Sequence, residues 1–153
     1  MLLWRISNHC DLDGLGGERA DGRWHTAARG KRIVYLSEHP ALALVEVLAN
    51  LKTSARLLPE FYQLMKVAVA EAVTPDALDV SLSKEWRENL SETRSLGDRW
   101  LATGSSALLI VPSGPSPESS NYLLNPRRGG AKDLEIEWCR WVAYDKRIFV
   151  TRT

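Results

Sequence analysis

The order of apolar and polar residues predicts a series of short strands. Residues 31–37 (KRIVYLS) and 61–70 (FYQLMKVAVA) are rich in β-branched and aromatic side chains, which favour strands. Residues 107–111 (ALLIV) form a continuous apolar run that ends at a proline, as is typical of a strand buried on both faces. A first strand is expected around Trp4 and Arg5.

One helix is predicted strongly. Residues 40–51 (PALALVEVLANL) are mostly helix formers, and Pro40 lies in the first turn, where its missing N–H is harmless. Ser37 is a candidate for the helix cap. Shorter elements are expected further on: helices over 83–90 and 98–103, a long loop over 112–130 and a closing strand over 146–151. Because strands outnumber helices and do not alternate with them regularly, the pattern favours an α+β fold over a doubly wound parallel sheet.

Length and composition indicate one soluble globular domain over residues 1–153. The chain has 44% hydrophobic and 25% charged residues, which is enough for a core and argues against a disordered or fibrous protein. Twenty Lys and Arg residues against nineteen Asp and Glu residues give a formal charge of +1. No strong global field therefore attracts nucleic acid or an anionic membrane, and any anion must be held locally.

The chain contains few candidate metal ligands and no long apolar segment. Cys10 and Cys139 lie far apart and outside any CxxC spacing, and there are three histidines, so neither a disulfide framework nor a metal site is expected. No run approaches 18 apolar residues, and Arg5 interrupts the N-terminal segment where a signal peptide would be apolar. We expect a cytoplasmic protein in a reducing compartment, with no membrane contact.

Glu46 is the most informative residue of the predicted helix. It is the only charged residue between Ala41 and Leu51, and its helical neighbours are small or apolar. An ionised carboxylate in such a setting needs a partner or a cleft, because burial without one costs several kcal/mol. The alternative is a lone glutamate on the exposed side of a short helix, and periodicity alone does not separate the two.

Basic residues are concentrated between residues 22 and 37, where no acidic residue occurs. Planar guanidinium groups suit bidentate contact with phosphate, so this segment is a candidate for holding a pyrophosphate. Arg23, and Arg5 in the first strand, lie beside tryptophans and are the better candidates. A solubilising hairpin is the favoured reading of the other three: Arg29, Lys31 and Arg32.

Four segments together resemble the RES domain, the toxin of bacterial RES–Xre toxin–antitoxin modules, whose name denotes an arginine, a glutamate and a serine. The similar segments are LWRIS (3–7), the block from Gly22 to Leu51, GDRWLATGSSALLIVPS (97–113) and NYLLNP (121–126). They follow the family's order and span most of the chain. The most specific features are Tyr35 eleven residues before Glu46, and NYLLNP after a strand that ends in VPS.

The resemblance implies a fold similar to ADP-ribosyltransferases, with mostly antiparallel strands and flanking helices. It also implies NAD as the substrate and cleavage of its nicotinamide–ribose bond, with water or phosphate as the acceptor. By the same resemblance, the catalytic residues are Glu46, Arg5 and Tyr35. The residues that bind NAD are then Arg5, Arg23, Tyr35, Ser113 and Asn125, and no metal is involved.

Other motifs point less clearly to chemistry. Glu135 and Glu137 have the E-x-E spacing of many ADP-ribosyltransferases, but in a strand this spacing only places two acids on one face. The glycine-rich segment 12–17 lacks the GxGxxG order of a dinucleotide-binding turn, and Ser113 lacks the GxSxG context of a hydrolase. These classes of enzyme are not supported.

The resemblance further implies a cognate Xre-type antitoxin and an oligomeric toxin–antitoxin complex, with the segment from Pro112 to Gly130 as a candidate contact. Two alternatives to NAD degradation stay open. One is a toxin that transfers ADP-ribose from NAD to a protein, and the other is a non-catalytic interaction domain. The presence of the family's five functional residues together argues against the second alternative.

Overall fold

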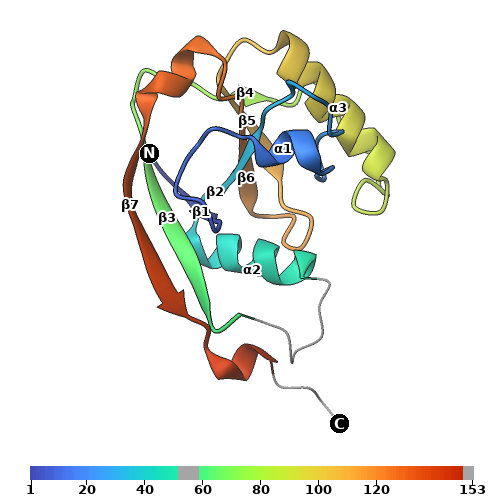
Figure 1. The fold of residues 1–153 in the computed structure, drawn as a ribbon. Coiled ribbons are helices and arrows are strands. Elements are labelled where there is room, and N and C mark those ends of the chain that lie inside the picture. The colour runs from blue at the N-terminus through green and yellow to red at the C-terminus, as the bar shows by residue number, and fades with distance from the viewer. Residues whose placement is uncertain (52–58, 150–153) are drawn as a thin grey trace.

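The computed structural model describes residues 1–51 and 59–149, and its main feature is a twisted sheet (Figure 1). Seven strands of the described chain join in the order β4-β5-β6-β2-β1-β3-β7. All neighbours are antiparallel except β4 and β5. The strands are β1 (Leu2–Ile6), β2 (Val34–Ser37), β3 (Phe61–Val69), β4 (Asp76–Ala77), β5 (Leu108–Pro112), β6 (Ser120–Leu124) and β7 (Leu134–Ala143). The predicted α+β class with mostly antiparallel strands is confirmed.

Three α-helices accompany the sheet within the described ranges. They are α1 (Gly16–Arg19), α2 (Pro40–Asn50) and α3 (Leu90–Thr103), and 3-10 helices cover Gly129–Asp133 and Lys146–Phe149. Helix α2 begins at Pro40 as predicted, but the N-cap is His39, whose Nδ1 accepts a hydrogen bond from the Ala41 N–H at 3.1 Å. Ser37 is therefore free for another role. In Figure 1, α2 lies across the ends of β1 and β2.

The prediction of two short helices over 83–90 and 98–103 is wrong, because the structure has one longer helix, α3, in this region. It runs unbroken over Leu90–Thr103, whereas residues 84–88 form turns. The segment 91–97 is rich in serine, threonine and glycine, which are weak helix formers. Tertiary contacts outweigh this weakness, because the Thr93 hydroxyl donates to the Arg23 carbonyl at 2.5 Å and Gly97 packs directly against the Trp24 carbonyl.

Two predictions near the C-terminus are also wrong. The expected loop over 112–130 contains strand β6, and residues 146–149 of the expected closing strand form a 3-10 helix, while 150–151 lie outside the described residues. The strand at this edge of the sheet is β7 instead. Its first five residues alternate between less exposed and exposed positions, but the two-residue period breaks after Trp138, where Cys139 is half-buried and Arg140 and Trp141 are both exposed.

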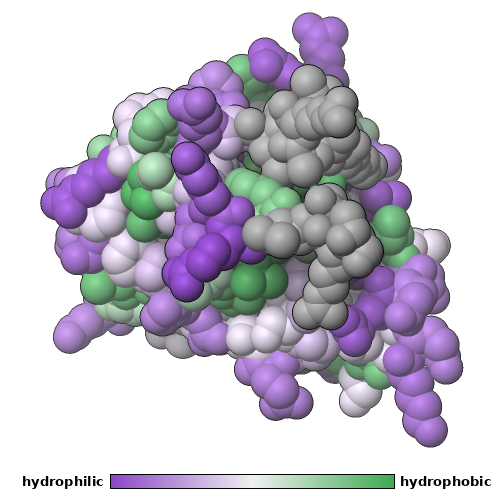
Figure 2. Space-filling view, turned by 90° about the horizontal axis from the view of Figure 1, so that it is seen from below, coloured by the Kyte–Doolittle hydropathy of each residue, from purple (hydrophilic) through white to green (hydrophobic). Residues whose placement is uncertain are grey.

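Apolar side chains pack on both faces of the sheet. Successive residues of β5 pack on opposite faces of the sheet. Leu108 belongs to one apolar cluster, with Leu3 and Met65. Leu109 belongs to the other, with Trp24 and with Trp100 of α3. Seen from below, the molecule shows apolar residues near its middle, with hydrophilic residues to the left of them (Figure 2).

The structure joins Cys10 and Cys139 in a disulfide, contrary to the expectation that no disulfide forms. The two residues are 129 positions apart in the sequence, with Cα atoms 6.2 Å apart. Such a pair leaves no local spacing signal, because only the return of the loop after β1 onto β7 brings the two residues together.

No helix of the described chain is both long and apolar enough to cross a membrane. Residues 1–51 and 59–149 contain no cluster of three or more His, Cys, Asp or Glu side chains suited to a metal.

Candidate active site

A cavity of about 500 Å³ lies where β1 and β2 meet α1 and α2. In the described chain these two strands share a single register pair, Trp4 opposite Ser37, so β1 and β2 are paired over a short length only. The cavity is lined on one side by Trp4, Arg5 and Tyr35 and on the other by Glu46 and Val47. This volume is within the range of small-molecule sites.

Glu46 presents its carboxylate at the wall of this cavity. Its Oε1 accepts hydrogen bonds from the Ser113 hydroxyl at 2.7 Å and from the Asn121 Nδ2 at 2.6 Å. Ser113 is fully buried and Glu46 is half-buried. The exposed-glutamate alternative is therefore wrong, since the carboxylate has the partners that an ionised group requires.

Asn121 is held in turn by Ser37. The Ser37 hydroxyl donates to the Asn121 Oδ1 at 2.8 Å, and both residues are buried. They face each other across the β2–β6 pair, whereas Ser113 directly follows β5. Three separate strands and the α2 helix thus converge on one carboxylate.

Arg5 shares the cavity with Glu46. Its Nη1 donates to the Asp11 carbonyl at 2.8 Å. Burial lowers the pKa of Arg5, and the nearby carboxylates of Asp11 and Asp13 oppose that shift. An arginine stays protonated throughout the physiological range, so the cavity contains a fixed positive charge.

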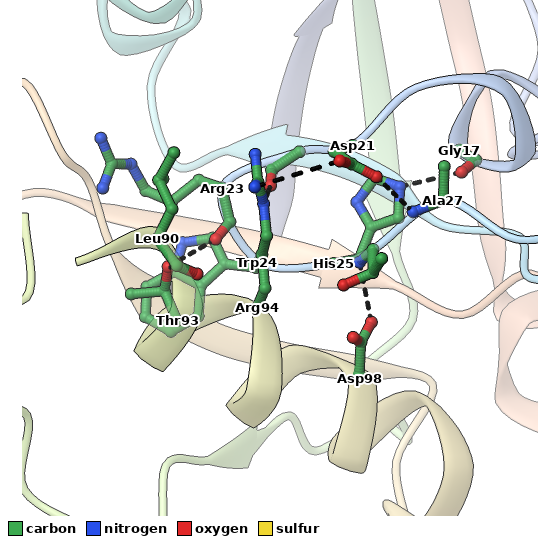
Figure 3. Close-up of polar contacts among 12 residues, drawn as sticks. Gly17, Asp21, Arg23, Trp24, His25, Ala27, Leu90, Thr93, Arg94 and Asp98 are labelled. Carbon is green, nitrogen blue, oxygen red and sulfur yellow. Dashed lines mark hydrogen bonds and ion pairs between the residues drawn. The ribbon is translucent and has the colours of Figure 1, made fainter. Parts of the chain in front are cut away.

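Tyr35 points its hydroxyl into a closed network rather than into the open cavity. The hydroxyl oxygen accepts from the Trp24 N–H at 3.0 Å and lies 2.8 Å from the His25 Nδ1. The His25 Nε2 is 2.9 Å from the Gly17 carbonyl, a contact drawn in Figure 3. Because that carbonyl requires a donor, Nε2 carries the proton and Tyr35 donates to Nδ1. Burial also raises the pKa of Tyr35, so the phenol stays neutral.

Replacing Tyr35 with phenylalanine is expected to lower stability rather than catalysis. The change leaves the Trp24 N–H and the His25 Nδ1 without their partner, at a cost of about 1–3 kcal/mol in the free energy of unfolding. The ring that lines the cavity is retained. Urea denaturation measures the first effect, and Tyr122→Phe is a matched control. A drop in kcat of more than about a hundredfold (about 2.7 kcal/mol) at unchanged stability would contradict this role.

Three predicted site residues lie outside the lining of this cavity: Ser113, Arg23 and Asn125. Arg23 points away from His25 in Figure 3, donates to the Arg87 carbonyl at 3.0 Å and packs over Trp86. Asn125 borders a different cavity of about 330 Å³. The structure thus brings Arg5, Tyr35 and Glu46 together with Ser113 behind the glutamate, and leaves the other two apart.

Several residues of the cavity were missed in the sequence. They are Trp4, Asp21, His25, Ser37 and Asn121. Asp21 accepts from the Ala27 N–H at 2.7 Å, and Arg94 of α3 reaches toward it with 4.0 Å between the charged groups (Figure 3). The E-x-E motif takes no part in lining the cavity, because it lies on β7, where Glu137 pairs with Lys66 at 3.2 Å.

Comparison with known proteins gives a consistent family and fold. The RES domain family matches residues 2–142. The chain is 39% identical over 137 residues to the protein named Toxin Res of Pseudomonas putida, covering 90% of this chain and 92% of that relative. It is 33% identical over 157 residues to the Prs ADP-ribosylating toxin of a Sphingobium species, covering 95% of each.

A solved structure shares the fold. The crystal structure of the Mycobacterium tuberculosis MbcT–MbcA toxin–antitoxin complex contains a chain that superposes with a TM-score of 0.70. The match covers 93% of this chain and 84% of that one, at 19% sequence identity. At this identity the likeness shows the architecture, and the residues of the site must be argued from their own geometry.

Proposed function

The chain belongs to the RES domain family, and on this premise we propose that it is a toxin that consumes NAD by breaking the bond between nicotinamide and ribose. The observation that carries the proposal is the Glu46 carboxylate, fixed by Ser113 and Asn121 in a cavity that it shares with Arg5. The names of the relatives, Toxin Res and Prs ADP-ribosylating toxin, support the toxin role.

The chemistry requires a negative charge beside the sugar. As the nicotinamide leaves, positive charge develops on the ribose in an oxocarbenium-like transition state. At about 4 Å and an effective dielectric constant near 20, a carboxylate attracts such a charge by roughly 4 kcal/mol. This energy corresponds to about a thousandfold in rate. Both described hydrogen bonds of the carboxylate go to Glu46 Oε1, so Oε2 is the oxygen available to the sugar.

The rest of the cavity suits a dinucleotide. Arg5 supplies the positive charge that a pyrophosphate needs, and the rings of Trp4 and Tyr35 offer flat surfaces for the nicotinamide or the ribose. Arg23, outside the cavity lining, remains a candidate for the phosphates only if the bound substrate extends past Gly22. Ser113 acts through Glu46, because its hydroxyl is buried and bound to the carboxylate.

Replacing Arg5 with alanine is expected to raise the KM for NAD about 10- to 100-fold, with a smaller change in kcat. The reason is the loss of a charge-assisted hydrogen bond, worth about 1.5–3 kcal/mol. Steady-state kinetics of NAD loss measures the effect. Arg29→Ala, which removes an exposed arginine of the basic segment 22–37, is the matched control. An unchanged KM in Arg5→Ala would remove Arg5 from the binding role.

The acceptor of the ADP-ribose distinguishes two forms of the proposal. We favour NAD degradation with water or phosphate as the acceptor. Transfer to a protein is the second candidate, and the 33% identity to the Prs ADP-ribosylating toxin favours it. Incubation of the purified chain with labelled NAD and a cell extract separates them. Free ADP-ribose or its phosphate supports degradation, whereas label retained on a protein band supports transfer.

A toxin that consumes NAD must be silenced in the cell that makes it. We therefore propose a cognate antitoxin of the Xre type and an oligomeric complex, acting in the cytoplasm where NAD is available. The toxin–antitoxin complex of the structural neighbour supports a protein partner. A purified chain that leaves NAD intact after removal of any partner would revive the non-catalytic alternative.

A further inference from the structure

We propose that Asn121, oriented by Ser37, is a positioning residue that determines which oxygen of Glu46 faces the substrate. The proposal rests on the proposed function, since the reaction that it serves is NAD cleavage. It assigns a role to a buried pair outside the set carried over from the family resemblance.

The hydrogen bonds leave one orientation for the Asn121 amide. The Ser37 hydroxyl donates at 2.8 Å to Oδ1, so the amide oxygen is occupied and the Nδ2 faces Glu46 at 2.6 Å. The opposite orientation would place the amide NH₂ against the Ser37 hydroxyl and the amide oxygen against a carboxylate. The carboxylate, which only accepts, thus selects the orientation in which Asn121 donates, and the Ser37 hydroxyl holds that orientation by donating to Oδ1.

The register of the sheet fixes both partners. Ser37 lies opposite Asn121 in the β2–β6 pair, and Asn121 lies opposite Val111 of β5, two residues before Ser113. The Ser113 hydroxyl also accepts from the Ser116 N–H at 3.1 Å, which holds its proton toward Glu46. The two donors therefore reach the same carboxylate oxygen from two adjacent strands.

Two hydrogen-bond donors fix the orientation of the Glu46 carboxylate, whereas one donor does not. The last torsion of a glutamate side chain is broad, and a single hydroxyl can bind either carboxylate oxygen. With Ser113 and Asn121 both on Oε1, the plane of the carboxylate is set and Oε2 is directed to the cavity. The benefit is largest in the transition state, where the charge on the ribose develops, so loss of Asn121 lowers kcat more than it changes KM.

Kinetics of Asn121→Asp and Asn121→Ala test the proposal. The aspartate retains the size of the side chain and the bond to Ser37 but places a second carboxyl group against Glu46, whereas the alanine removes the donor without adding a charge. We expect both variants to lower kcat by about 10- to 100-fold, with KM within about threefold of wild type. Ser37→Ala, which retains the donor and loosens it, is expected to give a smaller decrease in kcat. Tyr122→Phe controls for disturbance of β6, because Tyr122 packs against the apolar core.

A double-mutant cycle separates positioning from an independent role. If Asn121 acts through the carboxylate, Asn121→Ala in a Glu46→Gln background causes no further loss of activity. An additive loss, an unchanged kcat, or a raised KM at constant kcat would overturn the proposal. If the wild-type chain leaves NAD intact, the proposed function fails instead. Crystal structures of wild type and Asn121→Ala then decide the inference, which a Glu46 carboxylate that keeps its orientation in the variant overturns.

Discussion

Replacing Glu46 with glutamine is expected to lower NAD consumption by about a thousandfold or more and to leave the fold intact. The glutamine Oε1 still accepts from Ser113 and Asn121, so the side chain retains its position and loses only its charge. The oxygen that faces the sugar is replaced by an NH₂ group, which repels the developing positive charge. The initial rate of NAD loss measures the effect, and thermal unfolding checks the fold.

A surface acid supplies the control for this prediction. Glu85 lies exposed in the turn region before α3, and Glu85→Gln removes the same charge from the protein as a whole. It is expected to behave as wild type in the NAD assay. In cells, Glu46→Gln is expected to abolish growth arrest at equal expression. Arrest that persists in this variant would refute the assigned role.

Replacing Gly97 with alanine is expected to give the largest loss of stability. A Cβ at this position would overlap the Trp24 carbonyl, and backbone on both sides has little room to move. The higher helix propensity of alanine recovers about 1 kcal/mol at most. We expect a net loss of about 3 kcal/mol or more in the free energy of unfolding. For a chain of this size, the loss lowers the Tm by about 6–12 °C.

Gly16 provides the matched control for the glycine substitution. A Cβ on Gly16 meets no other atom within 4 Å, so Gly16→Ala is expected to change the Tm by less than about 2 °C. Differential scanning calorimetry of the two variants beside wild type compares them directly. Equal Tm values for Gly97→Ala and Gly16→Ala would show that α3 can move away from Trp24, contrary to the packing described above.

The fold was predictable where local pattern and tertiary structure agree. Helix α2 and strands β2, β3 and β5 have the periodicity that their burial requires, and each was predicted at nearly its observed place. Helix α3 was not, because the buried contacts of Thr93 and Gly97 with the segment at Trp24 outweigh the low propensity of the helix sequence. Those contacts join residues about 70 positions apart, which no local window includes.

The residue pattern alone predicted Glu46 and Arg5 of the site, and the family resemblance added Tyr35 and Ser113. Glu46 stood out as a lone charge in an apolar helix, and the structure gives that charge its partners. Ser37 and Asn121 did not stand out, because their meeting depends on the register of strands 84 residues apart. Arg23 was chosen because it lies beside Trp24, but its contacts are with the Arg87 carbonyl and the Trp86 ring, more than 60 positions along the chain, which no local pattern indicates.

Under the proposed function, the cavity that contains Glu46 and Arg5 cleaves the nicotinamide–ribose bond. The most direct measurement is a time course of NAD and free nicotinamide with purified chain freed of any partner, with and without phosphate and cell extract. The expected result is one nicotinamide released for each NAD consumed, at a rate that falls with Glu46→Gln. Intact NAD and no nicotinamide under all of these conditions would contradict the claim.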